Sequence, residues 1–181
     1  HLVNDMLIHP GSRGRLQRNP RQDPDAEHGL LMVLCLDLAM SAGTIRLRDN
    51  DPRVQPLIDY DYLSDEFDRS RMREGVRICL DLAEHDDWKS LVTERVVPAD
   101  SDLESDEALD RWLMRGAQTS HHSSGTVKMG SATDPMAVVD TAGRVYGLEG
   151  LRVADASIMP DCTRANTNAT SIMIGERIAD L

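Results

Sequence analysis

Residues 41–84 read SAGTIRLRDNDPRVQPLIDYDYLSDEFDRSRMREGVRICLDLAE, and this stretch contains two different hydrophobic periods. In its first part, Ile45 and Leu47 alternate with arginines, which is the period of two typical of a half-buried strand. The sequence DNDP follows at once, and Asp, Asn and Pro are residues that make turns. We therefore predict a strand around Thr44–Arg48 that ends in a turn.

The second part of the same stretch has the period of an amphipathic helix. Ser64 is the candidate N-cap, and Asp65 and Glu66 in the first turn complement the positive end of the helix dipole. The apolar residues whose spacing places them on one face are Met72, Val76, Cys79, Leu80 and Ala83. We predict a helix over 65–84 that covers a sheet.

An apolar run, GLLMVLCLDLAM at 29–40, precedes this stretch. Periodicity alone does not separate a buried strand from a helix in so short a run. Because a strand follows, we interpret Leu31–Leu36 as a strand antiparallel to Thr44–Arg48. Before it, Pro, Gly, Arg and Asp crowd His9–His28, so residues 1–28 are expected to be an irregular arm or linker.

Two further helices are expected downstream. One starts at Ser105 and uses Leu109, Trp112 and Leu113 as its apolar side, and the other starts near Asn168 and runs to the C-terminus. The predicted fold class is α+β, with an antiparallel sheet covered by helices.

Composition limits the possible partners. The 31 acidic and 20 basic side chains give a formal charge of -11. Most of the protein surface is therefore expected to repel nucleic acid and anionic membranes. The longest apolar run, around residues 30–39, is interrupted by Asp37, so no membrane span is expected.

The cysteines indicate the compartment. Cys35, Cys79 and Cys162 are odd in number and widely spaced, and none forms a CxxC pair that would suggest zinc or a redox couple. We expect a reducing cytoplasm, and no metal site.

The first motif that could carry chemistry is SHHSSGTVKMG, residues 120–130. Adjacent side chains diverge, so His121 and His122 are not expected to share one role. Two hydrogen-bonded loop histidines are the plain alternative to a catalytic histidine. A serine hydrolase is not indicated, because Ser124 lies outside a GxSxG turn.

Two more motifs follow. LEGLRVADASIMP, residues 148–160, ends a short apolar run on Asp155, which suits a nucleotide contact or merely caps the next turn. TRANTNATSIMIGERIADL, residues 163–181, clusters Asn166, Thr167, Asn168 and Thr170 before a helix. Open N–H groups at that helix start would favour a negative charge, although Asn168 could act only as an N-cap.

Taken together and in order, these motifs closely resemble the C-terminal signature of the glucose-methanol-choline (GMC) oxidoreductases, in particular the choline dehydrogenase-like and choline oxidase-like members. The segment SAGTIRLRDNDPRVQPLIDYDYLSD, residues 41–65, resembles the opening of that family's substrate domain. The resemblance covers roughly residues 30–181. It implies an FAD-dependent flavoprotein oxidoreductase that oxidises the CH–OH group of a small-molecule alcohol.

The resemblance assigns roles residue by residue. His122 matches the family's catalytic histidine, which takes the hydroxyl proton, and His121 departs from a position that is commonly aromatic. Asn166 matches the second active-site residue, which orients the substrate oxygen and stabilises developing alkoxide charge. The positions that match FAD contacts are Asp155, Ala156, Asn168, Ala169 and Thr170.

The resemblance also implies an organisation and its alternatives. Residues 29–135 would form the substrate-binding domain with the histidine loop, and residues 136–181 a strand-loop-helix that completes the FAD-binding domain. No GxGxxG occurs in the sequence, so FAD is expected to require an N-terminal half, and the isolated chain is expected to be an inactive fragment. The alternatives are a non-catalytic interaction module of the same fold and a hydroxynitrile-lyase-like member.

Overall fold

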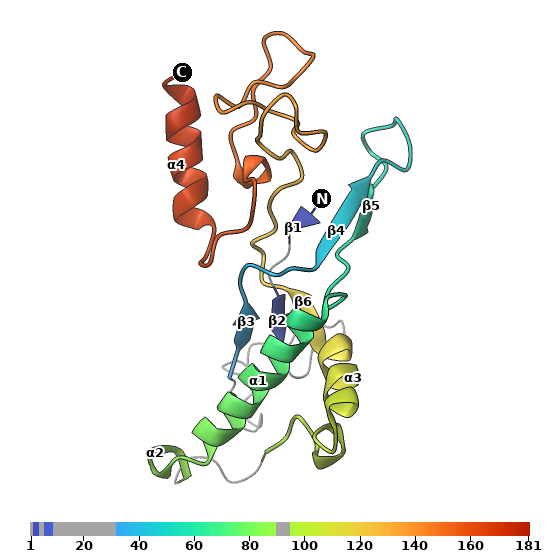
Figure 1. Cartoon of the computed structure of the whole chain (residues 1–181), viewed down its shortest axis with the longest axis vertical. Helices are drawn as coiled ribbons and strands as arrows, with labels where there is room; N and C mark the ends of the chain where they lie inside the picture. The colour runs from blue at the N-terminus through green and yellow to red at the C-terminus, as the bar shows by residue number, and fades with distance from the viewer. Residues whose placement is uncertain (1, 4–5, 9–31, 90–94) are drawn as a thin grey trace.

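The structure is a computed structural model that describes residues 2–3, 6–8, 32–89 and 95–181. The arm predicted at His9–His28 therefore lies outside the described residues. In chain order the elements are β1 (Leu2–Val3), β2 (Met6–Ile8), β3 (Leu34–Leu36), β4 (Ala42–Arg46), β5 (Leu57–Asp59), α1 (Glu66–Ala83), α2 (Asp86–Lys89), η2 (Asp100–Asp102), α3 (Asp106–Gly116), β6 (Ala117–Thr119), η3 (Ala156–Ile158) and α4 (Asn168–Ala179). The α1, α2 and α3 helices lie at one end of the molecule and α4 at the other (Figure 1).

Among the described residues, two small antiparallel sheets lie between these ends. One has the strand order β1-β4-β5 and the other β3-β2-β6. In the second sheet, Leu7 of β2 lies opposite Cys35 on one side and Gln118 on the other. The predicted class, a mixed fold with antiparallel sheet and covering helices, is confirmed.

The predicted pairing of the two strands is wrong. Leu34–Leu36 and Ala42–Arg46 are strands, but they belong to different sheets. The backbone between them bonds to α1 instead of forming a hairpin: Arg71 donates to the carbonyls of Asp37 and Leu38, and Asp68 accepts from the amides of Met40 and Ser41. This contact directs the chain out of the first strand's sheet.

The start of the chain also differs from the expectation. Residues 1–28 were predicted to be irregular, yet Leu2–Val3 and Met6–Ile8 are strands. Met6–Ile8 is the central strand of its sheet, and its partners lie far along the chain, at Leu34–Leu36 and Ala117–Thr119. So short a strand is stabilised by these distant partners, and no local pattern marks it.

The first hydrophobic core lies beneath α1. Met72 and Val76 of the predicted stripe are buried, and Cys79, Leu80 and Ala83 are half-buried, so the predicted face is confirmed. The buried members of this core are Leu36, Ala39, Leu63, Met72, Val76, Leu109 and Leu113. The N-cap is Asp65, which accepts from the Phe67 amide at 2.7 Å, and not Ser64 as predicted; the two neighbours have the same capping chemistry.

α3 has the predicted start and face. The Ser105 hydroxyl accepts from the Ala108 amide at 3.2 Å, which confirms the N-cap. Leu109 and Leu113 are 2% and 0% exposed, and Trp112 packs at the edge of the same core.

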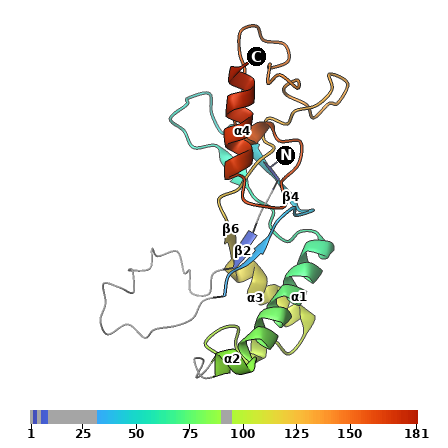
Figure 2. The same ribbon diagram turned by 90° about the vertical axis from the view of Figure 1, so that its left-hand side faces the viewer.

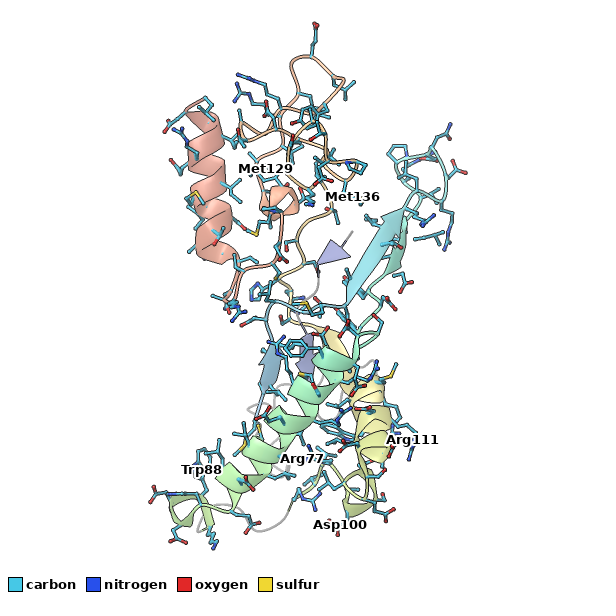
Figure 3. All side chains as sticks on the ribbon, viewed as in Figure 1. Arg77, Trp88, Asp100, Arg111, Met129 and Met136 are labelled. Atoms are coloured by element: carbon cyan, nitrogen blue, oxygen red, sulfur yellow. The ribbon has the colours of Figure 1, made fainter. Side chains whose placement is uncertain are left out.

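Charged side chains join α1 to α3 across this core. The Arg73 guanidinium, whose side chain is 9% exposed, donates to Asp110 at 2.8 Å and to Glu66 at 2.6 Å. Arg77 pairs with Asp106 alongside, and Figure 3 shows Arg77 on α1. Hydrogen bonds from Arg73 and then Arg69 hold the pKa of Glu66 below its usual range, and the carboxylates raise the pKa of Arg73. The ion pairs of Arg73 with Asp110 and of Arg77 with Asp106 join the two helices, and Glu66 holds Arg73 from within α1.

We expect Arg73→Met to lower the free energy of unfolding by about 1–2 kcal/mol at pH 7, because it removes the charged hydrogen bonds to Asp110 and Glu66. A lowered pKa in the folded state means that Glu66 contributes stability above its unfolded value, near 4.3, and that this contribution is lost as the pH falls through the lower folded value. Urea unfolding should show a smaller difference between wild type and variant at pH 3. Arg53→Met, at an exposed pair with Asp51, is the control and should change little. An equal loss at both pH values would show that only packing of the arginine stem matters.

A second core lies at the end of the molecule that holds α4. Its buried residues are Val139, Ile158, Met159, Ile174 and Ile178. α4 contributes Ile174 and Ile178 and leaves Ile172 and Met173 exposed, so only one side of the helix is covered. Val127 and Met129 pack against this core although they precede residue 135. The division of the chain at that residue stays a prediction.

Candidate functional site

The histidine motif runs beside the second motif. The amides of Gly125, Val127 and Met129 donate to the carbonyls of η3 residues 156, 157 and 158, at 3.3, 2.9 and 2.8 Å. Met129 lies on this segment at the end of the molecule that holds α4 (Figure 3). Every second amide of residues 125–129 thus bonds to η3, and these bonds fix the position of the histidine motif against η3.

His122 joins the first motif to the third. Its Nδ1 lies 3.1 Å from the Oγ1 of Thr167, across 45 positions of sequence. Thr167 is 6% exposed and is the N-cap of α4, and the His122 side chain is half-buried. The first motif thus contacts both of the others: its residues 125–129 bond to η3, and His122 contacts the N-cap of α4, the helix labelled in Figure 2.

His121 points to a different environment. It is exposed, its φ is 72°, and its amide donates to the Thr119 hydroxyl at 2.9 Å. A positive φ is uncommon outside glycine, but histidine is among the residues that adopt it more often. His121 is exposed, whereas His122 is half-buried and contacts Thr167, so the two neighbouring side chains lie in different surroundings.

Asp155 caps the turn that follows it. Its side chain accepts from the Ser157 amide at 2.8 Å and begins η3, which is the plain alternative considered above. The residue is exposed, so its carboxylate remains accessible from outside. The Ala156 carbonyl accepts from Gly125, and Ala156 packs against the second core.

The start of α4 is open. Asn166, Asn168 and Ala169 are exposed and Thr170 is half-buried. Asn168 is the first helical residue and not an N-cap, because Thr167 already has helical backbone angles, with φ -75° and ψ -7°. The Thr167 side chain makes no capping hydrogen bond, so the first-turn amides receive none from it. An uncapped helix start of this kind attracts an anionic or electron-rich group.

Two residues of the site had no role in the sequence interpretation. Thr167 was recognised only as part of a polar cluster, and its contact with His122 has no local signal. Ser124 was considered only as a nucleophile; it is 1% exposed, and its hydroxyl has no hydrogen-bond partner among the described residues. Among those residues, no three of His, Cys, Asp and Glu converge on a metal site, and no helix is long and apolar enough to cross a membrane.

Known protein families and sequences contain clear relatives of this chain. A family model described as GMC oxidoreductase matches residues 39–175. The chain is 44% identical over 142 residues to oxygen-dependent choline dehydrogenase 1 of Chromohalobacter salexigens, which is 78% of this chain and 25% of that protein. It therefore spans about a quarter of the length of the curated relatives it matches.

Solved structures of similar fold and sequence also match this chain. The crystal structure of pyridoxine 4-oxidase from Mesorbium loti is similar with a TM-score of 0.75 and 30% identity, over 82% of this chain and 28% of that one. A variant of formate oxidase from Aspergillus oryzae RIB40, solved in a study of FAD modification, is similar with a TM-score of 0.73 and 32% identity, over 82% and 26%.

Proposed function

The chain belongs to the GMC oxidoreductase family, and from this premise we propose that it is the substrate-side part of an FAD-dependent enzyme that oxidises the CH–OH group of a small alcohol. The observation that carries the proposal is the hydrogen bond between His122 and Thr167, which joins the histidine loop to the open start of α4. A proton acceptor and a helix end that favours negative charge are the two features that this reaction needs.

His122 is the proposed base. One ring nitrogen is occupied by Thr167, and the other can accept the hydroxyl proton of the alcohol. Asn166 directly precedes Thr167 and is exposed, so its amide could donate to the same oxygen and stabilise the alkoxide as it forms.

The residues at the start of α4 fit a flavin. The amides of Asn168 and Ala169 lie in the uncapped first turn, and the alanine side chain leaves room for close approach. Asp155 and Ala156 lie on the segment that is hydrogen-bonded to the histidine loop, where we place the contact to the rest of FAD. When bound, FAD would supply the acceptor for the hydride that leaves the alcohol carbon.

Binding of FAD to this chain alone should be weak. The 181 residues contain no GxGxxG turn to hold the pyrophosphate, and the contacts above are few against the cost of ordering a large cofactor. We propose that an N-terminal FAD-binding portion is the partner of this chain. The purified chain should show no flavin absorbance. A stoichiometric yellow complex would contradict the proposal that tight FAD binding needs the N-terminal portion.

The proposed activity is best tested in a chimera. Residues 39–181 replace the matching C-terminal quarter of the Chromohalobacter salexigens relative, and the unaltered relative is the control for folding and flavin content. Because that relative is a choline dehydrogenase by name, choline is the first alcohol to supply. We expect choline or another alcohol to bleach the flavin absorbance when oxygen is excluded.

The alternatives give different results in the same experiment. A lyase of this family would leave the flavin oxidised with every alcohol and would not reduce an artificial electron acceptor. A non-catalytic module would bind flavin in the chimera but reduce neither flavin nor acceptor, and would release no cyanide from a cyanohydrin. A flavin-loaded chimera with no alcohol-dependent bleaching would overturn the proposed activity.

A further inference from the structure

We propose that Thr167 is a positioning residue for His122, and that its hydroxyl accepts the Nδ1 proton so that Nε2 is the ring nitrogen left open as the base. The proposal rests on the proposed function, because the direction of the hydrogen bond is argued from the reaction, but the ring tautomer itself can be measured without any activity. It is carried by the 3.1 Å distance between His122 Nδ1 and Thr167 Oγ1.

The first observation is that the Thr167 hydroxyl is not used as an N-cap. A threonine at this position ordinarily accepts a hydrogen bond from an amide two or three residues later. Here the backbone of Thr167 is already helical and the side chain makes no capping bond. The hydroxyl instead lies against the imidazole, so the capping contribution is forgone in favour of contact with His122.

The second observation is that the backbone of Thr167 is buried and hydrogen-bonded. The residue is 6% exposed, and its carbonyl accepts from both the amide and the hydroxyl of Ser171 at 2.8 Å. Further along, Ile174 and Ile178 fix α4 in the second core. A hydroxyl on so constrained a backbone fixes the position and direction of the ring that it contacts.

The direction of the hydrogen bond follows from the reaction. A neutral imidazole has one N–H and one bare nitrogen, and both nitrogens carry protons after it accepts a proton. If the hydroxyl donated to Nδ1, the bare nitrogen would already be occupied, and protonation there would break the bond. If the hydroxyl accepts from Nδ1, the same bond persists before and after the transfer, and Nε2 takes the proton.

The test uses two matched variants of the 181-residue chain. Thr167→Val keeps the branched shape and removes the hydroxyl, and Thr167→Ser keeps the hydroxyl. The ring nitrogens of His122 are observed by ¹⁵N NMR, with His122→Gln identifying their signals among the six histidines. Circular dichroism confirms that the helices are retained in each variant.

We expect wild type and Thr167→Ser to show a protonated Nδ1 and a bare Nε2 in the neutral ring. Thr167→Val should shift the population towards the Nε2–H tautomer. A wild-type ring protonated at Nε2 would overturn the proposal even if the valine variant failed to fold, and so would a valine variant with an unchanged tautomer.

The catalytic consequence is measured in the chimera described above. Flavin reduction by the alcohol should slow roughly 10- to 100-fold in Thr167→Val, as is typical when a group that orients a reactive residue is lost, with serine restoring most of the rate and KM changing little. A valine variant with the rate of wild type would overturn the positioning role. A chimera that oxidises no alcohol would instead contradict the proposed function and leave the tautomer result standing.

Discussion

Replacing His122 by Ala should slow alcohol oxidation by about 10²- to 10⁴-fold in the chimera, because the variant lacks the base that takes the hydroxyl proton. The bound flavin and the fold should survive, since His122 is half-buried in a loop and is not part of either hydrophobic core. Single-turnover stopped-flow measurement of flavin reduction separates this step from reoxidation and product release.

The neighbouring residues provide the controls. His121→Ala should have a much smaller effect, because its side chain is exposed and the contact with Thr167 is made by His122. Asn166→Ala should fall between the two histidine variants, since it removes a donor but not the proton acceptor, and Asn166→His should retain part of the activity because an imidazole N–H can donate at the same position. If His121→Ala were the slower of the two histidine variants, the assignment of roles within the pair would be reversed.

Features that depend on neighbouring residues were predictable from the sequence. The faces of α1 and α3 follow from apolar residues three and four positions apart, and the Ser105 cap follows from one hydroxyl at the right place. The predicted N-cap of α1 was wrong by one residue, because Ser64 and Asp65 are both good capping residues and the capping preference does not separate them. The structure uses the aspartate. The three segments of the candidate site could be recognised by motif, because they occur in a family order.

Features that depend on distant partners were not predictable. Met6–Ile8 is a central strand because it pairs with strands about 28 and 111 residues away. Three apolar residues alone do not indicate either partner. The contact between His122 and Thr167 is of the same kind. The alternation around Ile45 indicated a strand, but the strand is Ala42–Arg46 and not Thr44–Arg48, and Ile45 and Leu47 are 44% and 82% exposed instead of half-buried. The choice of partner was decided by side chains of α1 that bind the preceding backbone.

That choice rests mainly on Asp68, a carboxylate with 0% exposure. It accepts from the Met40 amide at 3.0 Å, the Ser41 amide at 2.7 Å and the Ser41 hydroxyl at 2.6 Å, and Arg71 lies 3.8 Å away. The Ser41 hydroxyl in turn accepts from the Asp65 amide at 3.1 Å, so the start of α1 and the start of β4 are fixed together. A buried carboxylate is tolerated when it is this fully hydrogen-bonded.

Asp68→Ala should therefore lower the free energy of unfolding by about 3–5 kcal/mol, because two backbone amides and a hydroxyl lose their acceptor in a place that water does not reach. Asp68→Asn should cost less but remain clearly destabilising, since its one carbonyl oxygen can replace only part of the carboxylate and its NH₂ group faces other donors. Urea unfolding of the 181-residue chain at pH 7 measures both. Asp81→Ala, which changes an exposed aspartate on the same helix, is the matched control and should stay within about 0.5 kcal/mol of wild type. A loss of less than about 1 kcal/mol for Asp68→Ala would mean that water or a rearranged backbone replaces the carboxylate, and that the separation of the two strands into different sheets has another cause.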